Sequence, residues 1–364
     1  MNDLHYAVVV GINRYPAISD LRGARGDAGR FRDWLVDPTG GNVPERNVAL
    51  VTATERDERE ADVMTAVPTR ESVNRALYLA HRAVRKAVDE GGNWADTRLY
   101  VFLAGHGIAP FGGDAALLMA NAAIDLLGNH IAVRPYLSWY ESASPFHEIV
   151  FLADCCRTRF GGVAAFGPPF TDTTEAPDKV ECLVGYATSL GDPAYEQQAP
   201  DPNRARGHFT SALIEGLRGA GGGTVTSEGK VTSDSLTDYV RRHVMDRTAE
   251  ALVPQEARFL RETSTPIVFA EGLQGVGSYP VTLRFPAGFR GWVELRGRDV
   301  TEPRRLYVDG AAGAAGTAGA VGAEHVEPLV PGLYKVVPES PAAPDFRDGG
   351  FFEVVTGGGH GVQF

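Results

Sequence analysis

The sequence predicts a mainly parallel α/β sheet with flanking helices, followed by a small all-β domain. Apolar, β-branched runs at residues 6–12, 99–103 and 149–153 are typical of strands that are covered on both faces. Residues 71–88 carry apolar side chains at three- and four-residue spacing, which predicts an amphipathic helix. Because strands and helices alternate along this part of the chain, a parallel sheet is the expected arrangement.

Further elements continue this alternation as far as residue 270. A helix that begins within residues 21–28 would carry Phe31, Trp34 and Leu35 on one face. The other expected elements, in chain order within each type, are strands at 48–51, 182–187 and 266–270, and helices at 136–142, 209–217 and 233–248.

The sequence changes character after Gly272, where we place a boundary between domains 1–272 and 273–364. Beyond it no long helical pattern remains, and short apolar runs are separated by Gly and Pro, which predicts a small β domain, most simply a sandwich. The Gly- and Ala-rich stretch 310–322 is expected to be a disordered loop. The predicted strands are 279–285, 291–296, 304–308, 333–337 and 351–355.

Composition excludes several classes of protein. The net charge of −11 argues against a nucleic-acid partner, because phosphate binding needs clustered Lys and Arg. An N-terminal export signal and an apolar run of 18 residues are both missing from the sequence, so we expect neither export nor membrane spanning. Three cysteines, two of them adjacent, do not make a disulfide framework. These features favour a reducing, cytoplasmic setting.

A histidine and a cysteine follow two successive predicted strands. His106 lies between two glycines after strand 99–103, and Cys156 follows strand 149–153. Reactive groups of a parallel sheet collect beyond the carboxyl ends of its strands, so these two side chains are expected to meet. Their separation of 50 residues (156 minus 106) is typical of the histidine and cysteine of caspases. Cys155 is expected to pack on the other face, because neighbouring strand residues alternate.

Several short blocks in a fixed order carry a resemblance to a known family. They are LRGARGDA at 21–28, GHG at 105–107, DCCR at 154–157, ATS at 187–189, AYE at 194–196 and GHFT at 207–210. With these blocks, residues 5–270 resemble the caspase and metacaspase-like cysteine peptidases. The resemblance implies a caspase-like fold and endopeptidase activity. The chain departs from the family at Arg157 and Thr158, where histidine and serine are common.

The family assigns a catalytic role to three of these positions. By resemblance, Cys156 is the nucleophile, His106 is its partner, and the backbone N–H groups of Gly107 and Cys156 stabilise the oxyanion. The chemistry supports this pairing, because a thiolate is the attacking form and an imidazole can take its proton and later protonate the leaving amine. Glycine also permits the close backbone approach that an oxyanion donor needs.

Asp27 and Asp154 have two interpretations. Taken alone, Asp27 is an acid at a helix start, and Asp154 an acid at a strand end that binds loop amides. By resemblance, both belong to the pocket for the substrate residue before the cut bond, the P1 residue, and would bind Arg or Lys. We favour the pocket, since carboxylates bind a guanidinium in a bidentate fork and repel an aspartate.

The resulting hypothesis is a cysteine endopeptidase that cleaves proteins after Arg, or after Lys. Two alternatives stay open: a catalytically inactive caspase-fold module that binds a regulatory partner through its β domain, and a different thiol-dependent hydrolase or transferase. We expect no cofactor and no metal, and we find no acidic cluster that matches calcium-dependent family members. Bacterial relatives often act in antiviral defence or programmed cell death, which is a family-level expectation only.

Overall fold

The structure of the protein is a computed structural model. It describes residues 2–54, 62–110, 113–172, 179–197, 205–219, 224–226, 228–273, 279–286, 289–297, 304–309, 324–329, 332–339, 349–354 and 360–363. The chain forms two compact units, which we describe separately. The first comprises Met1–Arg218 and Val231–Glu271, and the second comprises Gly219–Lys230 and Gly272–Phe364.

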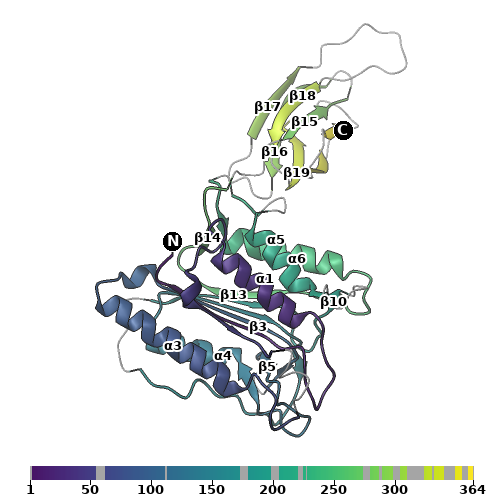
Figure 1. Ribbon diagram of the computed structural model, residues 1–364. Coiled ribbons are helices and arrows are strands. Elements are labelled where there is room, and N and C mark those ends of the chain that lie inside the picture. The colour runs from purple at the N-terminus through teal and green to yellow at the C-terminus, as the bar shows by residue number, and fades with distance from the viewer. Residues whose placement is uncertain are drawn as a thin grey trace. The chain divides into compact units, whose positions relative to one another are not determined.

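A six-stranded sheet forms the centre of the first unit (Figure 1). Its strand order is β13-β9-β7-β3-β1-β2. Five of its strands are parallel and β13 is antiparallel. The predicted mainly parallel α/β architecture is therefore confirmed. The strands are β1 (His5–Gly11), β2 (Val48–Val51), β3 (Arg98–Ala104), β7 (Glu148–Asp154), β9 (Glu181–Tyr186) and β13 (Arg258–Glu262).

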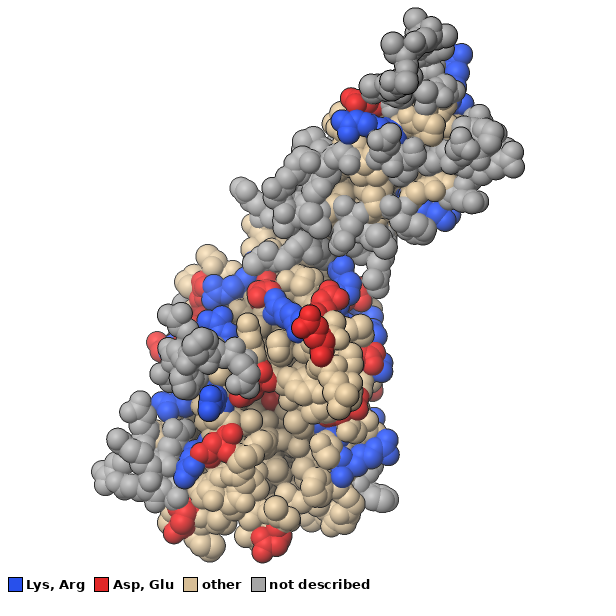
Figure 2. Space-filling view, turned by 90° about the vertical axis from the view of Figure 1, so that its right-hand side faces the viewer, with Lys and Arg blue, Asp and Glu red and all other residues tan. Residues whose placement is uncertain are grey.

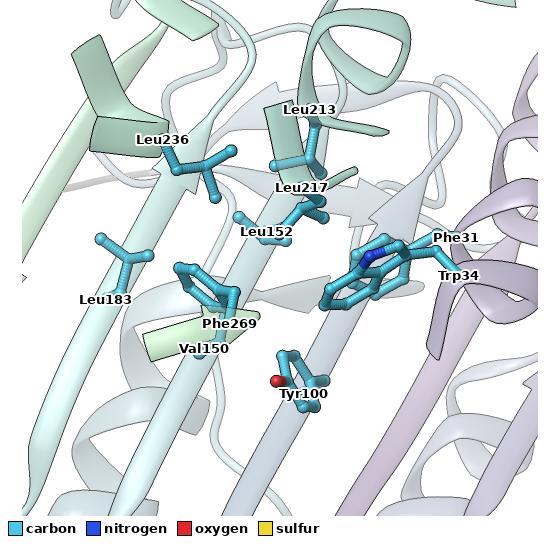
Figure 3. A pocket seen from close by; sticks show the side chains of 10 residues that line it. All are labelled: Phe31, Trp34, Tyr100, Val150, Leu152, Leu183, Leu213, Leu217, Leu236 and Phe269. Carbon is cyan, nitrogen blue, oxygen red and sulfur yellow. The ribbon is translucent and has the colours of Figure 1, made fainter. Parts of the chain in front are cut away.

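Helices cover both faces of this sheet (Figure 1). One face carries α1 (Ala24–Val36), α5 (His208–Leu217) and α6 (Ser233–Arg247), and the other carries α3 (Arg70–Asp89) and α4 (Val133–Ala143). Figure 3 shows the apolar contact on the first face, where Phe31 and Trp34 of α1 lie against Tyr100 of β3. The gap among these side chains has no room for a water molecule, so it is core and not a ligand site.

The structure differs from the prediction at three places in the first unit. Strand β13 was not predicted, because four of its five residues are exposed at the sheet edge and only Phe259 is partly covered. The predicted strand 266–270 is β14 (Val268–Ala270), which pairs with β12 (Val231–Thr232) outside the central sheet. Segments for which no strand was predicted form a small sheet of β4 (Gly107–Ala109), β5 (Ala116–Leu118), β6 (His130–Ala132) and β8 (Thr158–Arg159).

The second unit is all β in its described parts. Its two sheets have the orders β18-β15-β21 and β17-β16-β19-β20. Side chains such as Val281, Val293 and Val336 form one apolar core between them. The predicted disordered stretch 310–322 lies outside the described residues. The strands are β15 (Tyr279–Arg284), β16 (Arg290–Gly297), β17 (Arg304–Asp309), β18 (Glu324–Leu329), β19 (Gly332–Pro338), β20 (Gly350–Val354) and β21 (His360–Gln363).

The described surface mixes charges of both signs. In the face shown in Figure 2, acidic and basic side chains are interspersed over the described residues, and they do not gather into one large basic area. Among the residues with assigned positions, none of the helices is both long enough and apolar enough to cross a membrane.

Candidate active site

The ends of β3 and β7 bring His106 and Cys156 to one edge of the sheet. The two strands are adjacent and parallel, and Ala104 is in register with Asp154. The chain therefore leaves the sheet at the same level on both strands, two residues before His106 and two residues before Cys156. Both residues line a cavity of about 150 Å³, and Asp27 and Asp154 line it as well. The structure thus brings together all four side chains that the sequence singled out.

Two residues from the loop after β1 hold His106 in place. The ring nitrogen Nε2 lies 2.6 Å from the carbonyl oxygen of Ser19. A carbonyl can only accept, so Nε2 carries the hydrogen and Nδ1 is the basic nitrogen of the neutral ring. The backbone N–H of His106 donates to the Tyr15 hydroxyl (3.0 Å), which donates in turn to the carbonyl of Leu118 (3.1 Å). The rings of Tyr15 and His106 also pack with their centroids 4.9 Å apart.

The thiol of Cys156 is partly buried and contacts the backbone of Ala194. The N–H of Ala194 donates to Sγ at 3.2 Å, and the carbonyl oxygen of Ala194 lies 3.7 Å from Sγ. Burial raises the pKa of the Cys156 thiol, and the Ala194 N–H opposes this effect. Burial thus disfavours the thiolate, and a neighbouring base would help to form it.

Gly107 lies directly against the two cysteines. A Cβ atom at this position would lie 2.5 Å from the carbonyl oxygen of Cys156 and 2.6 Å from the Sγ of Cys155. A larger residue could not occupy the position without displacing the backbone of Cys156. Cys155 is only 2% exposed, and burial raises the pKa of its thiol well above the usual value. This thiol is therefore poorly suited to be a nucleophile.

Asp27 and Asp154 both face the start of helix α5. The N–H of Gly207 donates to Asp27 Oδ2 at 2.8 Å. Asp154 Oδ2 accepts hydrogen bonds from the N–H (3.2 Å) and the hydroxyl (2.5 Å) of Thr210. Free N–H groups and the positive end of the helix dipole stabilise negative charge at such a position. The GHFT block, which the resemblance left without a role, thus supplies the support for the two acids.

The two carboxyl groups are buried and close enough to disturb each other. Burial and the charge of Asp154 raise the pKa of Asp27 to about 8, although an ion pair with Arg30 opposes the shift. Burial raises the pKa of Asp154 to about 6, the Thr210 hydrogen bonds lower it, and the charge of Glu196 raises it further. The floor of the cavity is therefore a site that favours an added positive charge.

A third acid, Glu196, lines the same cavity and was not assigned a role from the sequence. Its carboxylate accepts hydrogen bonds from the N–H groups of Gly23 (2.7 Å) and Arg22 (3.2 Å) at the start of α1. It belongs to the short strand β10 (Glu196–Gln197), which pairs with β11 (Arg206–Gly207) and so reaches Gly207 beside Asp27. The AYE block contains this residue and could have drawn attention to it. The strands that position it are only two residues long, which is too short to give a recognisable sequence pattern.

In the described part of the chain, no group of three or more His, Cys, Asp and Glu side chains is arranged to hold a metal ion. The cavity instead is lined by both cysteines, Cys155 included, by an imidazole and by three carboxylates. This set can perform acyl transfer through a thioester while it holds a basic side chain.

Comparisons with known proteins give one sequence relative. No family model matches the chain. A protein of a Desulfuromonadales bacterium, named "Probable protease", is 29% identical over 255 residues. The match covers 67% of this chain but only 30% of that protein, so the chain spans less than a third of its relative's length. A solved structure titled "structure of pro-sf-caspase-1" aligns with 73% of this chain and 94% of its own, with a TM-score of 0.39 and 14% identity, and we infer nothing from so distant a likeness.

Proposed function

We propose that this protein is a cysteine endopeptidase that cleaves protein chains after Arg, and less readily after Lys. One observation carries the proposal: Cys156, His106 and the three acids Asp27, Asp154 and Glu196 line a single cavity. The relative named "Probable protease" supports a peptidase in general. The caspase-like blocks support the cysteine type.

The geometry suggests how each group would act. The Nδ1 atom of His106 takes the proton of the Cys156 thiol, and the thiolate attacks the scissile carbonyl carbon. The N–H groups of Gly107 and Cys156 donate to the oxyanion. His106 then returns the proton to the leaving amine, and water hydrolyses the thioester with His106 as the base. Ser19 and Tyr15 keep the imidazole in the required tautomer and position.

The three acids would select the P1 residue. Asp27 already binds Arg30 and Gly207, Asp154 Oδ2 already binds Thr210, and each Glu196 oxygen already accepts one backbone N–H. A substrate guanidinium would therefore be held mainly by Asp154 Oδ1 and by the second lone pairs of the Glu196 oxygens. With its pKa raised to about 8, Asp27 would add its charge there once a bound cation favours the ionised form. An aspartyl side chain would meet repulsion from all three acids, which argues against cleavage after Asp.

The setting is part of the proposal as well. Cys155, Cys156 and Cys182 are all free thiols, which fits a reducing, cytoplasmic compartment. A role in bacterial defence or programmed cell death follows from the family resemblance alone.

A peptide-library digest tests the proposal directly. Wild type is expected to cut after Arg, less after Lys and never after Asp, and a peptidyl-arginyl chloromethyl ketone should label Cys156, as located by mass spectrometry. Cys156→Ala and His106→Ala are expected to be inactive. Labelling of Cys155 in place of Cys156, or faster cleavage after Asp than after Arg, would refute it. Labelling of neither cysteine by the arginyl reagent would favour a catalytically inactive module.

A further inference from the structure

The segment of residues 187–196, which we call the pocket loop, forms one wall of the cavity. Its last three residues, Ala194, Tyr195 and Glu196, line that cavity. Ala194 contacts the Cys156 thiol, and Glu196 is one of the three acids. The position of the peptide at Tyr195 therefore decides how the nucleophile and this acid are placed relative to each other.

Gln255 ties both ends of the pocket loop together. Its side-chain Oε1 accepts a hydrogen bond from the N–H of Tyr195 at 2.9 Å, and its Nε2 donates to the carbonyl of Ala187 at 2.9 Å. Only this orientation of the amide satisfies both groups, because the first can only donate and the second can only accept. Gln255 has no exposed surface. A buried amide with both ends paired is a strong local constraint.

The support for Gln255 comes from the end of helix α6. Its backbone N–H donates to the hydroxyl of Thr248 at 2.8 Å, and that hydroxyl donates to the carbonyl of Val244 at 2.8 Å. Thr248 is itself buried. A continuous chain of hydrogen bonds thus runs from α6 through Gln255 to the backbone N–H of Tyr195, the residue between Ala194 and Glu196.

We propose that Gln255 is a positioning residue for the P1 pocket: it holds Glu196 and the Ala194 peptide where a basic P1 side chain and the thiol need them. This inference rests on the proposed function. Without the Oε1 acceptor, the Tyr195 N–H is left buried and unpaired, and the pocket loop relaxes toward other partners. The thiol and the imidazole come from β7 and β3 and keep their places. P1-dependent reactions should therefore suffer most, while the intrinsic reactivity of Cys156 should change less, and only through the Ala194 N–H that donates to its thiol.

The test compares Gln255→Met, which keeps the length of the side chain and removes both hydrogen bonds, with Gln197→Met. Gln197 is exposed on β10, next to Glu196, and makes a matched control. Each protein is assayed for kcat/KM on an arginyl peptide and for the rate at which iodoacetamide, which has no P1 group, alkylates Cys156. Thermal unfolding establishes that each variant is folded. Thr248→Val, which removes the acceptor of the Gln255 backbone N–H together with the hydroxyl's own bond to Val244, is tested in parallel in case Gln255→Met does not fold.

We expect Gln255→Met to lower kcat/KM at least about tenfold, mostly through KM, and to change the alkylation rate by a clearly smaller factor. Thr248→Val should show a smaller loss of the same kind, and Gln197→Met none. An arginyl kcat/KM within twofold of wild type in a folded Gln255→Met or Thr248→Val protein overturns the inference, and so does an equal loss of both reactivities. Failure of the wild type to cleave arginyl peptides would instead refute the proposed function and remove the basis of this inference.

Discussion

Replacing Asp154 by Asn is expected to make the protein more stable and less active at the same time. The carboxyl group is 8% exposed, and burial raises its pKa to about 6. A buried carboxylate near two other acids opposes folding once it is ionised, whereas an amide at this site keeps an acceptor for Thr210 and carries no charge. The acid therefore reduces stability at the place where the proposed function needs negative charge.

The size and pH dependence of the effect follow from the pKa. The usual value is 3.8 and the folded value is about 6, a rise of about 2 pH units, or about 3 kcal/mol at 1.36 kcal/mol per unit. Because the folded state binds the proton more tightly, the free energy of unfolding falls as pH rises from about 4 to about 6 and stays lower above that. Asp154→Asn removes this loss, so its advantage is absent below pH 4 and complete above pH 7. For a unit of this size, 3 kcal/mol corresponds to roughly 6–12 °C in Tm.

Differential scanning calorimetry from pH 4 to pH 8 measures this advantage, and kcat/KM on an arginyl peptide measures the cost. We expect activity at pH 7.5 to fall about tenfold or more, since a lost charge-assisted contact costs about 1.5–3 kcal/mol. Asp89→Asn, an exposed change at the end of α3, is the control and should stay within about 0.5 kcal/mol of wild type at every pH. A lower Tm for Asp154→Asn at pH 7.5, or a Tm difference that does not grow with pH, would show that burial of the ionised carboxylate does not lower the free energy of unfolding.

Three further predictions concern the catalytic pair and the pocket. Cys156→Ala and His106→Ala should each lower kcat on an arginyl peptide at least about a thousandfold, whereas Cys155→Ala should retain most of it; the reverse pattern for the two cysteines would exchange their roles. Tyr15→Phe leaves the His106 N–H unpaired and should lower kcat about tenfold with little change in KM, which steady-state kinetics can separate. Glu196→Gln should raise KM for arginyl peptides about tenfold and leave iodoacetamide alkylation unchanged, so slower alkylation would argue against a pocket role.

The sequence could predict that His106 and Cys156 lie at the same edge of the sheet, because neighbouring parallel strands end at the same edge. His106 and Cys156 follow two buried strands, and the apolar patterns of those strands are strong. Asp154 ends the second of these strands, and Asp27 lies in the first turn of α1. Each residue could therefore be assigned to the end of an element from local pattern alone. The resemblance then supplied the roles.

Local sequence pattern could not predict which residues contact these side chains. Ser19 and Tyr15 hold His106 from a loop without periodicity, across 87 and 91 positions of sequence. A carbonyl oxygen, as at Ser19, has no sequence signature, since every residue carries one. Strand β13 also escaped prediction, because an exposed edge strand does not need the apolar run that identifies a buried one.

The placement of the acids explains why the pocket depends on segments so far apart in sequence. Asp27 receives its Gly207 hydrogen bond across 180 residues, and Asp154 receives those of Thr210 across 56. A Cβ atom on Gly207 would lie 2.4 Å from Asp154 Oδ2, so the start of α5 can approach the acids only with glycine there. Two carboxyl groups that would otherwise repel each other are thus held by one helix N-terminus. That helix can hold them only where the chain folds back onto the sheet edge that carries Cys156, so the negative charge of the cavity lies beside the thiol.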